Sequence, residues 1–422
     1  MLDINLLREK PEIVRENLKK RFQKDKITLV DETIKKDQQW RELKKKSDDL
    51  RARRNTLSQE INQAKKNKKD ASKLIEEASK IPDKIKQIDQ EKEKLEKEIQ
   101  SNLKKIPNII HKNVPIGRDE NENKVIKTIG KPIKPKFKLA NHGDLLETHG
   151  QADFETAAKI SGAGFYFLKN KIAWLNQALL RYSIDFLRKK GYTYVEPPLM
   201  LRKEPYSGVV EMSDFENVMY KIENEDLYLI ATSEHPLIAQ FMNTNIPEEQ
   251  LPIKLVGYSM CFRKEIGSHG VDTKGLFRTH QFNKVEQIII CKPEDSWKYF
   301  EELLKNTEEI FNSLEMPYQL LEMCSGDLGT MKAKQIDLEL WMAKQGKYQE
   351  ATSLSNCTDY QARQLDIKSI DKNFNKTILH TLNNTAIATS RVLVGIIENF
   401  QQADGTILIP KALHKYTGFK SV

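Results

Sequence analysis

A heptad pattern between residues 31 and 105 constrains the fold more than any other feature of the chain. Its first half has a small or apolar residue at every seventh position, at Leu43, Leu50, Leu57 and Ala64. In its second half, the seam residues are spaced alternately four and three positions apart, which is typical of a coiled coil. These residues are Leu74, Ala78, Ile81, Ile85, Ile88, Lys92, Leu95 and Ile99. The pattern predicts an antiparallel helical hairpin over about 31–103, an arm of roughly 45 Å at about 1.5 Å per residue. Because Pro82 lies inside the second helix, we expect a kink or a late helix start.

All the excess positive charge lies in the same part of the chain. The 422 residues contain 69 Lys and Arg against 60 Asp and Glu, a difference of +9. Residues 1–110 contain 30 basic and 21 acidic residues, which is also +9, so 39 of each sign remain in residues 111–422 (69 − 30 and 60 − 21). A localised basic excess favours a polyanionic partner, nucleic acid first. From charge alone a solvated lysine-rich helix is the simpler interpretation, and periodicity does not separate RNA binding from a dimerisation coil or a partner-binding stalk.

Length and motif content exclude several other classes. At roughly 150 residues per domain, this length predicts two or three domains. The sequence has no apolar run of 18 residues and no secretory signal, so no membrane partner is expected. Its four cysteines lack CxxC spacing, which favours a reduced, cytoplasmic protein without disulfides or zinc. The absence of a GxxxxGK[ST] loop disfavours a P-loop nucleotide fold.

The remaining sequence predicts an α+β unit. A stretch rich in Pro, Gly, Asn and Lys, residues 106–141, is expected to be a linker and domain boundary. Helices are predicted at 144–160, 173–190 and 385–399, and strands at 192–198, 227–231, 258–265 and 277–290. A Gly-bearing loop, residues 266–276, separates the last two strands, which predicts an antiparallel sheet with a substrate-clamping hairpin.

Charged residues share one face of those two strands. Alternate positions of a strand project to the same side, which groups Arg263 with Glu265, and Arg278 with His280, Phe282, Lys284 and Glu286. Charged side chains in a sheet are unfavourable unless they contact solvent or a ligand. The simpler alternative to a ligand-binding face is an edge sheet whose polar face lies in water. An aromatic ring among arginines suits a planar base with phosphates attached.

Two further segments carry groups with several interpretations. Residues 348–353 offer a carboxylate and hydroxyls suited to a hard cation, although many loops contain such groups. Arg391 is the one charge in the first half of the predicted apolar helix 385–399. It is either a buried arginine paired with an acid or a guanidinium directed at an anionic ligand. For His280 a structural hydrogen-bonding role is favoured over that of a general base.

Together these residues resemble the class II aminoacyl-tRNA synthetases, and specifically the seryl-tRNA synthetase family. The segments that carry the resemblance are 191–198 for motif 1, 262–265 with 275–286 for motif 2, 389–391 with 398–399 for motif 3, and 232–234 and 355–361 for the seryl form. The resemblance implies a class II antiparallel sheet flanked by helices and an N-terminal antiparallel coiled-coil arm. It also implies a tRNA-binding domain at 1–110, a catalytic domain at 111–422, and a homodimer built through motif 1.

The same resemblance implies the activity, partners and cofactors. L-serine and ATP would form seryl-adenylate, and serine would pass to the 3′-terminal adenosine of serine tRNA, which has a long variable arm. Selenocysteine tRNA is left open as a second RNA substrate, Mg²⁺ is the expected metal, and no DNA partner is implied. Gln349, where the family commonly has arginine, and Leu354, where the residue is usually small, depart from the family pattern.

Residue roles follow from the resemblance. Arg263 and Arg391 would be catalytic, with Arg263 bridging the serine carboxylate and the ATP α-phosphate. The residues expected to bind L-serine are Thr232, Ser233, Glu234, Arg263, Glu286, Asn383 and Thr385. The residues expected to bind ATP are Arg263, Lys264, Glu265, Arg278, Thr279, His280, Gln281, Phe282, Glu350, Ala351, Thr352, Ser353 and Arg391. Glu350 and Ser353 would hold Mg²⁺.

Two other functions remain as alternatives. One is a synthetase-like ligase that charges a carrier protein with an amino acid, but such relatives lack the RNA-binding arm. The other is a non-catalytic RNA-binding coiled-coil protein, which predicts lost motif arginines, whereas Arg263, Arg278 and Arg391 are all present.

Overall fold

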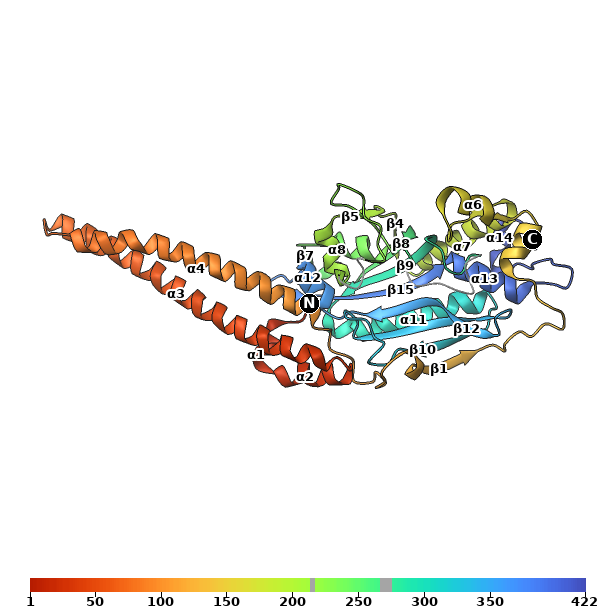
Figure 1. Cartoon of the computed structure of the whole chain (residues 1–422), viewed down its shortest axis with the longest axis horizontal. Coiled ribbons are helices and arrows are strands. Elements are labelled where there is room, and N and C mark those ends of the chain that lie inside the picture. Colours follow the sequence, from red (N-terminus) through yellow and green to blue (C-terminus); the bar gives the residue numbers. More distant parts are fainter. Residues whose placement is uncertain (213–216, 266–274) are drawn as a thin grey trace. The chain divides into compact units, whose positions relative to one another are not determined.

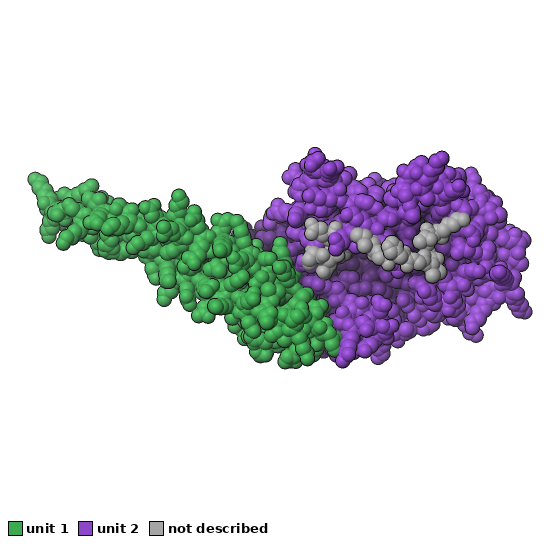
Figure 2. All heavy atoms as spheres, in the orientation of Figure 1, with its two compact units in different colours: residues 1–107 green, residues 108–422 purple. Residues whose placement is uncertain are grey.

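The computed structural model describes residues 1–212, 217–265 and 275–422. The chain divides into two compact units, unit 1 (residues 1–107) and unit 2 (residues 108–422), shown in green and purple in Figure 2. Most of the loop expected to clamp substrate, at 266–274, lies outside the described residues.

Unit 1 is helical and contains the predicted hairpin. Its elements are α1 (Ile4–Glu9), α2 (Pro11–Lys20), a 3₁₀ turn (Lys24–Lys26), α3 (Ile27–Lys66) and α4 (Ser72–Lys105). Figure 1 shows α3 and α4 side by side, as the heptads predict. The 40 residues of α3 extend about 60 Å at roughly 1.5 Å per residue, which is longer than expected. The predicted late start of the second helix is wrong, because α4 begins ten residues before Pro82 and continues through it.

The hairpin is held by a narrow apolar seam and by charged pairs along it. Leu57 is fully buried against Ile81 and Ile85. Arg53 donates to both carboxylate oxygens of Glu77 at 2.8 and 2.9 Å. Because residues late in α3 meet residues early in α4, the two helices run antiparallel. A seam this narrow buries little surface, so most side chains of the hairpin face solvent.

Unit 2 is built on one eight-stranded sheet. Its strand order is β1 (Lys124–Ile129), β10 (Tyr318–Glu322), β11 (Lys334–Met342), β12 (Lys347–Asn356), β15 (His380–Ala388), β9 (Gln281–Cys291), β8 (Ile253–Phe262) and β4 (Thr193–Val195). Every neighbouring pair is antiparallel except β4 and β8. Residues 106–141 are therefore more than a linker, because they supply the edge strand β1. Figure 1 shows the labelled strands following one another in this order, from β1 at the bottom of the sheet to β4 at its top.

Alternate residues of β9 show how the two faces of the sheet differ. Val285 and Ile289 pack into a core with the larger helices, α7 (Asn170–Lys189), α11 (Ser296–Ser313) and α13 (Thr389–Phe400). Ile288 and Ile290 belong to a second core on the other face, with α8 (Lys203–Val209), α10 (Glu234–Ala239) and α12 (Tyr360–Leu365). The second core covers only part of its face, and polar residues occupy the rest of it.

Short elements complete unit 2. The helices are α5 (His142–Thr148), α6 (Phe154–Ser161) and α14 (His414–Thr417), and the 3₁₀ turns are Glu120–Glu122, Glu248–Gln250, Pro293–Asp295 and Lys411–Leu413. The small sheets pair β2 (Ala152–Asp153) with β3 (Phe167–Leu168), β5 (Met200–Leu201) with β6 (Tyr228–Leu229), and β7 (Asn245–Pro247) with β13 (Lys368–Ile370) and β14 (Lys376–Ile378). Among the described residues, every helix is too short or too polar to cross a membrane.

Two predicted helices differ from the structure. The helix expected at 144–160 is broken into α5 and α6, because Gly150 adopts a positive φ of 65° and a short strand follows it. The helix expected at 385–399 begins at Thr389, since residues 385–388 belong to β15. A short apolar run has the same composition in a buried strand and in a buried helix.

Candidate active site

Two adjoining cavities open on the polar part of the large sheet. The larger, here called the polar cavity, has a volume of about 580 Å³ and is lined by residues that include Thr232, Glu234, Glu286, Asn383 and Thr385. The smaller, here called the arginine cavity, is lined by residues that include Arg263, Phe277, Arg278, Phe282 and Arg391. They share wall residues: Arg263, Glu265, Lys284, Glu350, Ser353 and Thr385. Figure 2 shows the hollow on the visible face of unit 2.

Strand pairing brings the predicted motif 2 residues together. Phe282, Lys284 and Glu286 occupy alternate positions of β9 and line the cavities from one face of the sheet. Arg263 follows the end of β8, and its N–H donates to the carbonyl of His280 at 3.0 Å, so the pairing continues one residue beyond the strand. The prediction that these charges face a ligand space rather than an outer sheet surface agrees with this geometry.

The arginine cavity combines guanidinium groups with aromatic rings. The Arg263 guanidinium lies 5.2 Å from the centre of the Phe282 ring, within the range of a cation–π contact. Arg391, from the first turn of α13, lies 5.4 Å from the centre of the Phe277 ring. Its Nη1 donates to the carbonyl of Glu350 at 2.7 Å and lies 3.2 Å from the Glu350 carboxylate. Both guanidinium groups are thus held in place by protein contacts.

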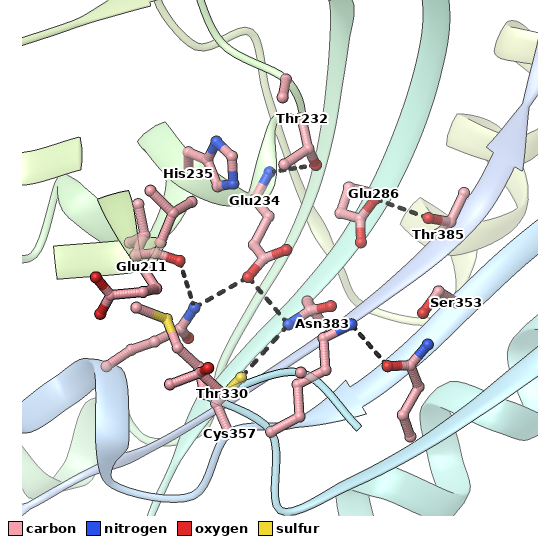
Figure 3. A pocket seen from close by; sticks show the side chains of 18 of the residues that line it. Glu211, Thr232, Glu234, His235, Glu286, Thr330, Ser353, Cys357, Asn383 and Thr385 are labelled. Carbon is pink, nitrogen blue, oxygen red and sulfur yellow. Dashed lines mark hydrogen bonds between the residues drawn. The ribbon is translucent and has the colours of Figure 1, made fainter. Parts of the chain in front are cut away.

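Two of the carboxylates that line the polar cavity, Glu234 and Glu286, have different partners (Figure 3). Glu286 Oε2 accepts a hydrogen bond from Thr385 Oγ1 at 3.1 Å and forms an ion pair with Lys284 Nζ at 2.6 Å. Glu234 Oε1 instead accepts from the side-chain amide of Asn383 at 3.1 Å. One acid is therefore already paired with a cation, while the other is held by neutral donors.

A buried chain of hydrogen bonds fixes the second donor to Glu234. Gln361 Nε2 donates to Glu234 Oε1 at 3.0 Å, and Thr381 Oγ1 donates to Gln361 Oε1 at 2.5 Å. Gln361 Nε2 also donates to the carbonyl of Val209 at 3.3 Å. Because a carbonyl and an ionised carboxylate only accept, these two partners fix the amide nitrogen toward Glu234, and the Thr381 hydroxyl donates to the oxygen at the other end. Gln361 and Thr381 are almost completely buried. The chain therefore holds the Glu234 carboxylate in one orientation.

Burial and neighbouring charges shift the pKa of the acids. Burial raises the pKa of Glu234, and the charge of Glu286 raises it further. Burial, followed by the charge of Glu350, raises the pKa of Asp337 to about 7. Burial alone would also raise the pKa of Glu350, but the charges of Arg391 and Arg263 lower it overall. The walls thus supply both a cationic and an acidic environment within one connected space.

The oxygen atoms of Glu350 and Ser353 are suited to a hard cation. Ser353 Oγ is buried and makes no hydrogen bond of ordinary geometry among the described residues, although Asp337 is its neighbour across β11 and β12. The Glu350 side chain is half exposed to the cavity. No cluster of three His, Cys, Asp or Glu ligands occurs in the described ranges. A metal ion that completes its shell with substrate phosphates and water fits such a donor set better than one held by protein alone.

Most residues expected to bind ligands line the two cavities, but four line neither. The Ser233 hydroxyl donates to the carbonyl of Gly257 at 3.2 Å, and Gln281 contacts the sulfur of Met260 at 3.4 Å. The ammonium group of Lys264 lies 5.9 Å from the centre of the Tyr220 ring.

The fourth is His280. Its Nδ1 lies 2.5 Å from the Tyr220 hydroxyl, and its ring stacks on Phe165. This hydrogen-bonded environment agrees with the structural role that the sequence favoured.

Other lining residues were not predicted as part of the site. They include Lys284, Asp337, Gln361 and Phe277. Lys284, Phe277 and Gln361 lie in segments that the sequence singled out, and the alternation along β9 was a signal for Lys284. Asp337 had no local signal, because its position in the cavity depends on the pairing of β11 with β12.

Comparisons with known proteins identify first a class and then a family. Residues 217–400 match the family model for the tRNA synthetase class II core domain (G, H, P, S and T). Unit 2 therefore contains the catalytic core of a class II tRNA synthetase. Residues 1–110 match the seryl-tRNA synthetase N-terminal domain. The chain belongs to the seryl-tRNA synthetase family.

Relatives match over nearly the whole chain. A serine–tRNA ligase of Methanocella arvoryzae is 50% identical over 99% of this chain and 98% of its own length. The structure of seryl-tRNA synthetase from Pyrococcus horikoshii complexed with ATP is 45% identical, covers 100% of this chain and 99% of that one, and has a TM-score of 0.95. A cytoplasmic serine–tRNA ligase from Naegleria fowleri in complex with AMP is 35% identical, covers 100% and 98% of the two chains, and has a TM-score of 0.90.

Proposed function

We propose that this chain is a serine–tRNA ligase that activates L-serine with ATP and transfers it to the 3′-terminal adenosine of serine tRNA. The observation that carries this proposal is the junction of the two cavities, where Arg263 lines a cationic aromatic space and an acidic space at once. The first suits a nucleotide with its phosphates and the second suits an amino acid. The full-length similarity to serine–tRNA ligases supports the same reaction.

Adenylate formation requires the serine carboxylate to attack the α-phosphorus of ATP. Because Arg263 lines both cavities, its guanidinium is suited to hold the carboxylate and an α-phosphate oxygen together. The carboxylate oxygen forms a bond to phosphorus, and the bond to the pyrophosphate leaving group breaks. No side-chain nucleophile takes part, so the contribution of the protein is alignment and neutralisation of charge.

The arginine cavity is proposed to bind ATP. Phe282 would stack on adenine, Glu265 would accept from the adenine amino group, and Arg278 and Arg391 would neutralise phosphates. The contact between Arg391 and Glu350 supports a cationic wall already in place before ATP binds. Lys264, Thr279, His280, Gln281, Ala351 and Thr352 remain in the proposed ATP-binding set. For the three that line neither cavity, Lys264, His280 and Gln281, we propose only an indirect role.

Mg²⁺ is proposed to be held by Glu350 and Ser353 together with ATP phosphates. The buried hydroxyl of Ser353, which makes no hydrogen bond of ordinary geometry in the described part of the chain, and the half-exposed carboxylate of Glu350 support this assignment. When bound, the ion would neutralise phosphate charge. Glu350 also orients Arg391 through their ion pair, so its removal affects the cavity even without a metal.

The polar cavity is proposed to select serine. Thr232, Glu234 and Glu286 would receive its ammonium and hydroxyl groups, while Asn383 and Thr385 close the cavity. Of these two acids, Glu286 is paired with Lys284, whereas Glu234 has only neutral donors among the described residues, so we assign the ammonium group to Glu234. A site that hydrogen-bonds a hydroxyl rejects the analogue without it by roughly 10⁴-fold, so alanine is excluded.

Residues 1–110 are proposed to bind tRNA, and residues 111–422 to form the catalytic domain. Four lysines near the end of the hairpin, Lys65, Lys66, Lys68 and Lys69, are exposed. Exposed lysines neutralise phosphates without reading bases, which suits recognition of the long variable arm by shape. Selenocysteine tRNA, whose charging would follow the same logic, is included as a second substrate to be tested.

A homodimer through the motif 1 region is part of the proposal. Support comes from large apolar side chains that remain exposed in the segments on either side of residues 191–198: Trp174 in α7 at 54%, and Leu199 and Met200 at 37% and 41%. Cytoplasmic location is proposed from the role in translation.

Serine-dependent ATP–pyrophosphate exchange tests the enzyme. In the presence of Mg²⁺, the folded protein should exchange label between pyrophosphate and ATP when serine is added and not when alanine is added. A lack of exchange would contradict the proposal and leave a non-catalytic RNA-binding protein. Exchange followed by transfer to a carrier protein, with no transfer to tRNA, would favour the carrier-protein ligase.

A further inference from the structure

The hairpin turn between β13 and β14 contains an unusual phenylalanine. Phe374 is 81% exposed, more than any other large apolar side chain in the described residues. Its φ is +63°, in the left-handed region. This conformation is unfavourable for residues with a Cβ atom, and glycine or asparagine normally occupies it.

The geometry of the turn explains the left-handed φ of Phe374, but it does not explain why an aromatic side chain occupies this position. The N–H of Phe374 donates to the carbonyl of Asp371 at 3.1 Å, and the N–H of Asp371 donates to the carbonyl of Asn375 at 3.0 Å. Such a three-residue hairpin loop requires a left-handed residue at its third position, which is usually glycine. Phe374 occupies that position, so its side chain serves neither the backbone nor the core.

Asp371 makes the turn rigid. Its Oδ1 accepts from the backbone N–H groups of Asn373 and Asn375, both at 2.8 Å, and its Oδ2 accepts from the Asn375 side chain at 2.9 Å. The carboxylate is therefore satisfied within the turn, and the ring of Phe374 is presented from a fixed frame. Backbone strain that the surroundings enforce is a feature of functional sites.

Two lysines flank Phe374 in the turn, in addition to the Asp371 carboxylate. Lys372 and Lys376 are exposed, and within the described ranges the structure records no ion pair for either of them. The more distant Lys368 is paired with Asp366 at 2.5 Å. An aromatic face between two free ammonium groups matches a base with its flanking phosphates, because bases stack on aromatic rings and lysines neutralise the backbone.

The turn also lies near the proposed site of transfer. β14 leads directly into β15, whose residues Asn383 and Thr385 line the polar cavity. The nine residue steps from Phe374 to Asn383 (383 − 374) span at most about 30 Å at roughly 3.3 Å per residue. A tRNA with its 3′ end in the cavity therefore has its acceptor end within reach of this surface.

We propose that the Phe374 turn, residues 371–376, is an RNA-binding surface that stacks an unpaired base of the bound tRNA. This inference rests on the proposed function and adds a contact in unit 2 that is separate from the arm. Phe374 supplies the stacking surface, and Lys372 and Lys376 contact the adjacent phosphates. Asp371 positions Phe374 through the backbone.

Phe374→Gly separates RNA binding from folding, because glycine relieves the left-handed strain while removing the ring. In aminoacylation assays with serine tRNA, we expect its KM for tRNA to rise about tenfold. Its serine-dependent exchange rate and its Tm should equal or exceed those of the wild type. Phe374→Trp, which keeps an aromatic surface, is the matched control and should keep the KM for tRNA within twofold.

Three results would overturn the inference. An unchanged KM for tRNA in Phe374→Gly would mean that the ring does not contact RNA. A lower Tm together with slower exchange would mean that Phe374 is structural. A change in dimer dissociation without a change in the KM for tRNA would assign the surface to a protein contact. If wild-type protein lacks exchange altogether, the proposed function fails first, and that result is distinct from these three.

Discussion

Two acids of the arm and two acids of the polar cavity have pKa shifts of opposite sign. In the arm, hydrogen bonds from basic neighbours lower the pKa of Glu77 and Glu98. In unit 2, burial raises the pKa of Glu234 and Asp337. The same chemical group is thus stabilised as an anion in the solvated hairpin and destabilised as an anion in the cavity wall.

This difference suits the two units to different ligands, a polyanion for the arm and small molecules for the cavities of unit 2. Exposed ion pairs contribute about 0–1 kcal/mol each, so the arm keeps its charges solvated and available to a polyanion at little cost to stability. Buried charges are costly unless a ligand completes their environment. Unit 2 therefore holds its acids and arginines in fixed positions, where they gain from binding ATP and serine.

The largest expected effect tests the fixed charges of the cavity. Arg263→Ala should lower serine-dependent ATP–pyrophosphate exchange by about 10³-fold, the loss typical of one charged stabiliser of a transition state. Arg263→Lys keeps the charge but loses the second donor, so it should be intermediate. Exchange within tenfold of wild type in Arg263→Ala would mean that the cavity charges are not arranged for this chemistry.

The next effect tests the arm. The variant lacks residues 44–91, and a short Gly-Ser turn joins the cut ends. It keeps the part of the hairpin next to α1, where Arg8 donates to buried Asp37 at 2.7 and 2.9 Å. We expect kcat/KM for tRNA to fall on the order of 100-fold, because several phosphate contacts are lost. Serine-dependent exchange should stay within twofold. Equal loss in both assays would instead show that the arm supports the structure of the catalytic unit.

A smaller effect, on the KM for serine, is expected when the chain of hydrogen bonds from Thr381 through Gln361 to Glu234 is broken. Thr381→Val removes the donor to Gln361 Oε1 and leaves that buried oxygen without its hydrogen bond, so Gln361 is held less firmly against Glu234. The KM for serine should rise about tenfold, equivalent to about 1.4 kcal/mol, with the KM for ATP unchanged. Thr381→Ser retains the hydroxyl and should restore the KM for serine. Equal rises in both variants would point to packing instead of orientation.

The smallest effect is a pH dependence of stability in the ligand-free protein. The folded chain holds a proton on Asp337 up to about pH 7, whereas the ordinary value is 3.8. Lowering the pH from 8 to 6 therefore favours the folded state, and this stabilisation is lost as the pH rises through about 7. Calorimetry should give a Tm gain between pH 8 and 6 that is a few degrees larger in wild type than in Asp337→Asn. Identical gains would contradict the raised pKa of Asp337.

Periodic features were the most predictable from the sequence. The heptads predicted the α3–α4 hairpin, and alternation along β9 predicted that Phe282 and Glu286 share a face. Both patterns are local, since they follow from the repeats of a helix and a strand. The boundary at Thr389 was missed, because the apolar residues before it suit either structure.

The sequence by itself determined the helical hairpin, the location of the excess charge and the residue types available for a nucleotide site. Only the tertiary structure decided which groups surround each acid. Glu234 accepts hydrogen bonds from Gln361 and Asn383, which are 127 and 149 residues away in the chain. Burial and hydrogen bonding depend on such distant segments packing together, so the orientation of Glu234 and the raised pKa of Asp337 are properties of the folded chain alone.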